Sequence, residues 1–187
     1  MIDMPSFDGS EDDLVRRAQA GNGQAFSELV RRHQRPVHRY LLRLLGSHDD
    51  AMELTQEAFI KAWQALPQWR PEAQFRTWLF RIANNTALDA LRRRKLVEFV
   101  PLEDSFDAPS SEPSPEHQAQ LTQEVRQLEA SLKKLAPEHR QILLLREVEE
   151  MSYEEIAVVL SLNEGTVKSR LARARTALIE IRTRSRP

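Results

Sequence analysis

A proline-rich, purely acidic stretch just past the middle of the chain constrains its fold more than any other feature. Residues 96–119 carry six Asp or Glu and no Lys or Arg, and they include four prolines. A segment of this composition buries too little apolar surface to fold by itself, so we expect it to be flexible and extended. The 187 residues are therefore predicted to form two domains, over 11–95 and 120–183, joined by a linker over 96–119.

Both predicted domains have the apolar spacing of α-helices. Only five residues are glycine, and alternation of β-branched residues is nearly absent. From Phe26 to Leu45 the apolar residues fall three, four and seven apart, and Pro36 is expected to kink or split this helix. Pro137 suits the first turn of a later helix. The predicted fold class is all-α, with two small helical domains joined by a flexible acidic linker.

The second helix of the first domain is expected to begin at Asp49 and Asp50, because carboxylates suit the positive N-terminal end of a helix. Six residues at helical spacing are predicted to form its buried face: Met52, Thr55, Phe59, Ala62, Trp63 and Leu66. A long helix is then expected from about Phe75 to Lys95, before the acidic stretch begins.

Composition excludes several classes of function. The chain has no cysteine, which rules out disulfides, thiolate catalysis and cysteine-ligated zinc. The acidic N-terminus is unlike a secretory leader, and no run approaches the ~18 apolar residues of a membrane helix. The histidines are scattered, and no nucleophile–base pair or Gly-rich phosphate loop appears. We expect a cytoplasmic protein that is not an enzyme, with no cofactor, no metal and no small-molecule substrate; a helical enzyme is a remote alternative.

The net charge of −1 conceals an uneven distribution. Residues 14–95 carry 15 Lys or Arg against 7 Asp or Glu, and residues 163–187 carry 7 against 2. Two basic segments separated by an acidic one are typical of a bipartite binder of polyanions. Two helical domains with ordinary solvated faces would show the same counts, so charge alone leaves both interpretations open.

Residues 152–178 have the spacing and chemistry of a helix-turn-helix. Ser152 and Glu155 form an S-x-x-E capping box that starts a short helix, and Asn163 is a suitable N-cap for a second one. A basic second helix of this kind enters the major groove of DNA, with a plain helical hairpin as the alternative. Ser161 stands in the turn, where many such motifs have glycine, which predicts slight strain.

Three stretches of the chain resemble the extracytoplasmic-function (ECF) sigma factors of the sigma-70 family. Residues 160–175, Leu-Ser-Leu-Asn-Glu-Gly-Thr-Val-Lys-Ser-Arg-Leu-Ala-Arg-Ala-Arg, resemble the family's region 4. Residues 50–63 resemble its polymerase-binding helix, and residues 75–89 resemble its promoter-melting and −10-recognition segment. The resemblance implies a transcription initiation factor that binds bacterial core RNA polymerase, directs it to −35/−10 promoters and promotes DNA melting.

The resemblance also implies roles for residues of the first domain. The helix over 50–63 would contact the coiled coil of the polymerase β′ subunit, with the β subunit as a further partner, through Asp50, Glu53, Gln56 and Glu57. Promoter melting and −10 recognition would involve Arg76, Trp78, Phe80, Arg81, Asn85, Asp89, Arg92 and Arg93. Aromatic faces stack on unstacked bases and asparagine suits base edges, although Trp78 is equally well explained as a core residue. The loop over 68–74 matches the family's pocket for a flipped base.

In the second domain the resemblance assigns contacts with the −35 element and its phosphates to Lys168, Ser169, Arg170, Arg173 and Arg175. It also implies an anti-sigma factor that would regulate the protein and hold it at the inner membrane. The acidity of the linker suggests that it mimics nucleic acid in the polymerase RNA-exit path. A stand-alone helix-turn-helix regulator is the main alternative, but it leaves the matches over 50–63 and 75–89 unexplained.

Overall fold

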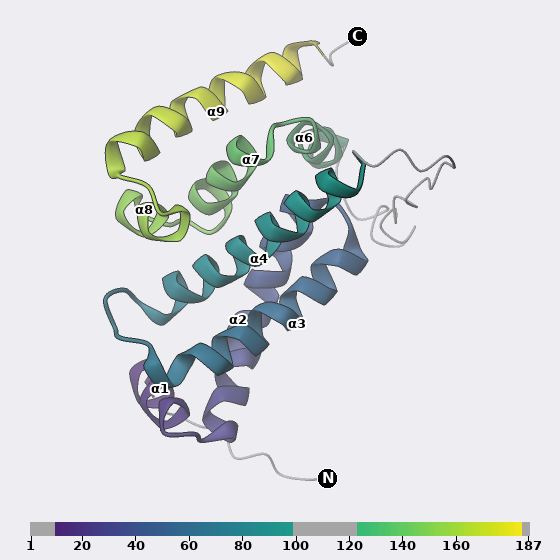
Figure 1. Cartoon of the computed structure of the whole chain (residues 1–187). Helices are drawn as coiled ribbons and strands as arrows, with labels where there is room; N and C mark the ends of the chain where they lie inside the picture. The colour runs from purple at the N-terminus through teal and green to yellow at the C-terminus, as the bar shows by residue number, and fades with distance from the viewer. Residues whose placement is uncertain (1–9, 99–122, 185–187) are drawn as a thin grey trace.

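The computed structural model describes residues 10–98 and 123–184, and every secondary-structure element in these ranges is a helix (Figure 1). The first range forms α1 (Glu11–Gln19), α2 (Gly23–Leu45), α3 (His48–Ala65), the short 3-10 helix η1 (Leu66–Gln68) and α4 (Phe75–Glu98). The second range forms α6 (Gln123–Lys133), α7 (Pro137–Leu143), the π-helical segment η2 (Leu144–Val148), α8 (Tyr153–Leu160) and α9 (Glu164–Arg184). The all-α prediction is confirmed for these residues.

Local chemistry sets the ends of the helices in the N-terminal domain. The Asn22 side chain accepts a hydrogen bond from the Ala25 amide at 2.9 Å and starts α2. Gly46 ends that helix in the left-handed region, at φ 75°, which glycine adopts without strain. Ser47 then caps α3, and Asp49 and Asp50 lie in its first turn as predicted.

Two helices differ in extent from the sequence predictions. Pro36 lies inside α2, which continues as one helix from residue 23 to 45, so the predicted split is wrong. Val37, Tyr40 and Leu41 follow the proline with 0–1% of their surface exposed, and this packing holds the helix together across the missing amide. Helix α4 runs to Glu98, past the predicted boundary at residue 95. Most of the predicted flexible linker lies outside the described residues.

Met52 was also assigned to the wrong face of α3. Its surface is 49% exposed, and the buried face is formed by smaller neighbours such as Ala51, Ala58 and Ala62, each 0% exposed. Alanines allow close approach of the helices that pack on α3. The buried face of α3 is therefore formed by alanines that stand next to the large apolar residues in the sequence, and not by those large residues. Trp63, next to Ala62, is likewise 37% exposed.

A buried hydrogen bond joins the two long helices of the N-terminal core. The Tyr40 hydroxyl on α2 donates to Asn84 Oδ1 on α4 at 2.8 Å, and both residues are 1% exposed. The Tyr40 ring also packs on Phe80, with centroids 5.5 Å apart. Burial and the nearby Glu149 carboxylate raise the pKa of Tyr40, so the hydroxyl stays protonated and able to donate.

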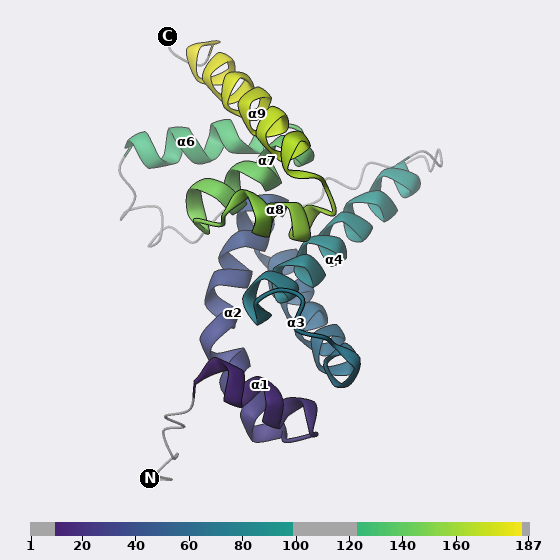
Figure 2. The same ribbon diagram turned by 90° about the vertical axis from the view of Figure 1, so that its left-hand side faces the viewer.

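The two domains pack against each other. Figures 1 and 2 both show α8 beside α4, and α7 and η2 contact α2. The Arg140 guanidinium of α7 donates to the Leu44 carbonyl oxygen at 2.6 Å, at the C-terminal end of α2 where carbonyls lack helical partners. Loss of water from around Arg140 lowers its pKa. None of the helices in the described ranges has the length and apolarity needed to cross a membrane.

The Tyr40–Asn84 pair gives a stability prediction. Tyr40→Phe should lower the free energy of unfolding by about 1–3 kcal/mol, because it leaves a buried amide oxygen without its donor. Tryptophan fluorescence in urea measures this directly, since all three tryptophans (Trp63, Trp69 and Trp78) lie in the N-terminal domain. Tyr153→Phe, in the C-terminal domain, is the control and should leave that transition in place. An unchanged midpoint for Tyr40→Phe would contradict the role of this hydrogen bond.

Candidate nucleic-acid interface

The predicted helix-turn-helix is present in α8 and α9. Ser152 Oγ accepts from the Glu155 amide at 3.1 Å and Glu155 Oε2 accepts from the Ser152 amide at 2.8 Å, which completes the capping box. Asn163 Oδ1 accepts from the Thr166 amide at 2.8 Å and starts α9. Ser161 adopts the left-handed conformation, with φ 53° and ψ 48°, which is unfavourable for residues other than glycine. The predicted strain in the turn is consistent with these angles and stays a prediction.

Apolar packing fixes which face of α9 is presented to solvent. Val167, Leu171 and Ala174 are at most 1% exposed and pack towards Ile156 and Val159 of α8, which are 0% exposed. Because these positions recur at four and three along α9, the side chains between them point away from the domain. Figure 1 shows α9 running above α8 and α7, with its C-terminal part extending towards α6.

The residues predicted to contact the −35 element lie on that outward face. Lys168, Ser169 and Arg173 are exposed, and the Ser169 hydroxyl donates to the Thr166 carbonyl at 3.1 Å. Arg173 Nε donates to the Ser169 carbonyl at 3.4 Å, one turn away on the same side. The Lys168 ammonium lies 5.7 Å from the centre of the Tyr153 ring, which limits its movement.

The two remaining arginines of this group differ from each other. Arg170 is half-buried. Arg175 is exposed but paired with Glu147 of η2 at 2.6 Å, and this hydrogen-bonded carboxylate raises the pKa of its guanidinium. A phosphate would have to compete with Glu147 for Arg175, whereas Lys168 and Arg173 have no such carboxylate among the ion pairs in the described residues.

A second exposed polar stripe runs along α4. Arg81, Asn85 and Asp89 recur every four residues and are all exposed, so they share one side of the helix. Arg92 extends the stripe and pairs with Asp89 at 3.2 Å, and Arg93 is also exposed. The stripe carries three arginines against one aspartate, with an amide between them, which suits contacts with both phosphates and base edges.

The aromatic residues of the same segment are less accessible. Phe80 is 0% exposed, so it is a core residue of the packed form, and its contact with unstacked bases remains a prediction. Trp78 is half-buried in a cluster with Trp69 and Phe75, at centroid distances of 5.2 and 5.7 Å. Trp69 belongs to the loop that was predicted as the flipped-base pocket, so the cluster connects that loop to α4.

Arg76 lies at the contact between the two domains. Its guanidinium donates to Glu149 Oε2 at 3.1 Å and to the Glu149 carbonyl at 2.8 Å. Arg39 of α2 donates to Glu149 Oε1 at 2.9 Å. The adjacent Thr77 hydroxyl donates to Glu155 Oε1 at 3.1 Å, so the capping box of α8 also contacts α4. Sequence analysis missed Arg39 and Glu149, which are 110 residues apart and belong to no shared motif.

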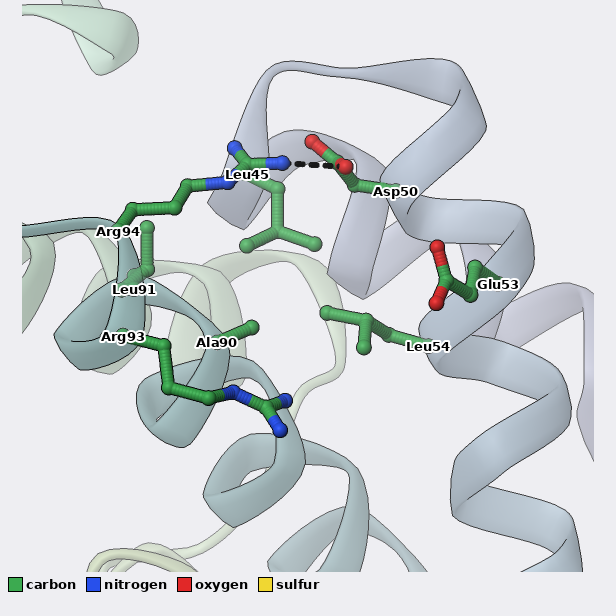
Figure 3. Close-up of a pocket in the computed structure, with 8 residues that line it drawn as sticks. All are labelled: Leu45, Asp50, Glu53, Leu54, Ala90, Leu91, Arg93 and Arg94. Atoms are coloured by element: carbon green, nitrogen blue, oxygen red, sulfur yellow. Dashed lines mark ion pairs between the residues drawn. The ribbon is translucent and has the colours of Figure 1, made fainter. Parts of the chain in front are cut away.

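The residues predicted to bind polymerase lie on α3, and two of the four are already paired. Asp50 forms an ion pair with Arg94 of α4, across a pocket lined also by Glu53 and Arg93 (Figure 3). Glu57 pairs with Lys61 at 2.7 Å within the helix. Glu53 and Gln56 are exposed, and the same helix exposes the apolar Met52 and Ile60, the latter at 57%.

Within residues 10–98 and 123–184, no three His, Cys, Asp or Glu side chains come together in a group that could hold a metal ion.

Comparison with known proteins follows the two-domain division. The model of Sigma-70 region 2 matches residues 29–97, and that of Sigma-70, region 4 matches residues 125–178. The RNA polymerase sigma-H factor of Pseudomonas aeruginosa is 40% identical over 174 residues, which cover 88% of this chain and 90% of that protein. The chain belongs to the ECF sigma factors of the sigma-70 family.

Another relative is longer than this sigma factor. The ECF RNA polymerase sigma factor SigE of Mycolicibacterium smegmatis is 39% identical over 158 residues, which cover 82% of this chain but only 60% of that protein. Factors of this family direct RNA polymerase to promoters, and a stand-alone helix-turn-helix regulator is not favoured.

Solved structures show a similar fold. CnrH, determined in complex with the cytosolic domain of CnrY, matches with a TM-score of 0.71 and 27% identity, over 94% of this sigma factor and 99% of CnrH. The sigma factor RpoE of Bartonella quintana, determined with the anti-sigma factor NepR, matches with a TM-score of 0.67 over 86% of this chain and 98% of that one. At 24% identity, the second match supports the fold alone.

The turn at Ser161 gives the second prediction. Ser161→Gly should stabilise the C-terminal domain by about 0.5–1 kcal/mol, because relief of the left-handed strain exceeds the extra chain entropy of glycine. Hydrogen exchange of the α8 and α9 amides measures the opening free energy of this region. Ser169→Gly, in the interior of α9, should instead destabilise it by about 0.5 kcal/mol. Equal losses of protection in both variants would show that Ser161 is unstrained.

Proposed function

We propose that α9 reads the −35 element and that the exposed stripe of α4 contacts the −10 element. The observation that carries this proposal is the presence of two separate basic and polar faces, each fixed by a buried core on its opposite side. On α9 the face is formed by Lys168, Ser169 and Arg173, with Arg170 and Arg175 at its margins. A helix-turn-helix places such a face in the major groove, where side chains reach both bases and phosphates.

On α4 the contacts are assigned to the exposed residues Arg81, Asn85, Asp89, Arg92 and Arg93. Asn85 is the best suited to base edges, and the arginines to phosphates. Trp78 has part of its ring exposed and is the aromatic candidate for stacking on a melted base. Arg76 is freed for DNA only when its contacts with Glu149 are broken, whereas Phe80 is buried in the N-terminal core against Tyr40.

We assign polymerase binding to the exposed side of α3. Glu53 and Gln56 supply polar groups, and Met52 and Ile60 add apolar surface next to them. A mixed surface of this kind fits a protein partner, because apolar anchors give affinity and charged neighbours give orientation. Asp50 and Glu57, which are paired within the domain, would contribute less. The coiled coil of the β′ subunit is the proposed partner.

An anti-sigma factor is the proposed regulator. The match to CnrH, which is 27% identical and was solved in complex with the cytosolic domain of CnrY, supports a protein partner of this kind. We place the protein in the cytoplasm, where core polymerase and promoter DNA are available, with the inner membrane as the site of sequestration.

Run-off transcription tests the function. Purified core polymerase would be supplied with templates randomised at the −35 and −10 positions, with and without the full chain. Transcripts that depend on the protein and share a bipartite consensus would support the assignment. Absence of such transcripts, together with tight binding of the free protein to duplex DNA, would contradict it.

The −35 face gives a salt-dependent prediction. Arg173→Ala should weaken binding of the polymerase–protein complex to promoter duplex and reduce the slope of log affinity against log salt by about one, because one phosphate contact is lost. Filter binding between low and moderate salt measures both quantities. Arg182→Ala, an exposed arginine near the end of α9, is the matched control and should leave the slope unchanged. Identical slopes for both variants would remove Arg173 from the interface.

The α3 surface gives a prediction for polymerase affinity. Ile60→Ala should weaken binding to core polymerase by about tenfold, the effect of losing roughly 1–2 kcal/mol of apolar burial. Competition against a labelled wild-type chain measures the change. Ile179→Ala removes an isoleucine that is 65% exposed on α9, and it should compete as well as wild type. Equal competition by the two variants would place the polymerase surface elsewhere.

A further inference from the structure

Glu149 places three acceptor oxygens against two arginines of the other domain. Its two carboxylate oxygens accept hydrogen bonds from Arg39 Nη2 at 2.9 Å and from Arg76 Nη2 at 3.1 Å. Its backbone carbonyl oxygen accepts a further hydrogen bond from Arg76 Nη2 at 2.8 Å. The Glu149 side chain is only 1% exposed, whereas Arg39 and Arg76 remain 47% and 29% exposed. Three oxygens facing two guanidiniums are the arrangement that a nucleic-acid phosphate would offer.

The N-terminal domain supports the positions of Arg39 and Arg76 independently of Glu149. The Arg76 guanidinium lies 5.2 Å from the centre of the Phe80 ring, which is fully buried. Arg39 precedes Tyr40, whose hydrogen bond to Asn84 joins α2 to α4 inside the N-terminal domain. The helices that carry Arg39 and Arg76 are therefore held together within the N-terminal domain and do not depend on Glu149 for their placement.

The local charge also favours an anion. Glu11 of the N-terminal domain also interacts electrostatically with Arg76, and its carboxylate is engaged by His33 at 2.9 Å. That hydrogen bond and the nearby positive charges lower the pKa of Glu11, so it carries its charge at neutral pH. One carboxylate held by His33 leaves Arg39 and Arg76 with an excess of positive charge once Glu149 departs.

We propose that Arg39 and Arg76 form a binding site for a backbone phosphate of the melted promoter strand, and that Glu149 occupies this site in the packed form. The inference rests on the proposed −10 role of α4, because Arg76 lies on the same helix as the exposed stripe from Arg81 to Arg93. Glu149 then acts as an intramolecular competitor. DNA enters the site only when the domains separate, and domain packing weakens DNA binding by the free chain.

The contact between α8 and α4 adds a second reason for mutual exclusion. In a helix-turn-helix the first helix crosses the DNA backbone. The N-terminal end of α8 is instead held by Thr77 through Glu155 at 3.1 Å. The same packing therefore occupies the Arg39–Arg76 site and also holds the end of α8 that DNA would approach in a helix-turn-helix.

The test compares two single-charge variants of the full chain. Glu149→Gln removes the competing charge with little change in shape, and Glu150→Gln removes the same charge from the exposed neighbouring residue. The probe is a fluorescein-labelled single-stranded 15-nucleotide DNA of mixed sequence, followed by anisotropy over a range of salt. Small-angle scattering of each free variant reports whether the domains have separated.

Glu149→Gln should increase the radius of gyration and tighten binding of the oligonucleotide by about tenfold relative to Glu150→Gln. Adding Arg39→Gln to Glu149→Gln should abolish most of this gain and reduce the salt slope by about one. Equal affinities for Glu149→Gln and Glu150→Gln would overturn the proposal. An increase in oligonucleotide affinity that survives Arg39→Gln would also overturn it. So would displacement of the oligonucleotide by inorganic phosphate at a concentration equal to that of the oligonucleotide phosphates.

These outcomes are distinguishable from failure of the proposed function. Run-off transcription by the wild-type chain with core polymerase does not require the competition between Glu149 and DNA. A chain that supports promoter-specific transcription but shows no difference between the two variants would keep its function and lose this phosphate site.

Discussion

The buried carboxylate of Glu149 is the interaction on which the arrangement of the whole molecule depends. A carboxylate that is 1% exposed is costly to bury unless it is paired, and both of its arginine partners belong to the other domain. Moving the domains apart returns Glu149, Arg39 and Arg76 to water, where each is well solvated. Such a contact therefore adds little net stability but fixes how the two domains fit together.

This balance suits a protein that must change shape to function. The proposed −35 and −10 faces lie on α9 and α4, and the packed form brings their two domains into direct contact. Apolar contacts and the Arg140–Leu44 hydrogen bond would add to the packing. A protein bound to the exposed side of α3, or DNA bound to the chain, can shift the population towards separated domains. It does so only if it binds the separated form more tightly than the packed form. Polymerase and promoter DNA both fit this requirement, whereas an anti-sigma factor would favour a form that hides the DNA contacts.

Local chemistry was readable from the sequence, and contacts between domains were not. The capping box at Ser152 and Glu155, the N-cap at Asn163 and the strained turn at Ser161 were predicted because each depends on residues within a few positions of one another. Met52 was placed on the wrong face, since the close packing of helices around alanines cannot be seen in a pattern of large apolar residues. The Arg39–Glu149 pair joins residues that are 110 positions apart and belongs to no sequence motif. The contact of Glu149 with Arg39 and Arg76 could therefore be seen only in the structure.

The distance between the domains tests the central claim most directly. Because the chain has no cysteine, spin labels can be attached specifically at Gln64→Cys on α3 and Glu180→Cys on α9, both exposed positions. Pulsed electron resonance would compare the free chain with the chain bound to core polymerase and promoter DNA. A single distance in the free chain and a different one in the complex is the predicted result. The same distance in both states would contradict the claim that the packed form must open to bind DNA.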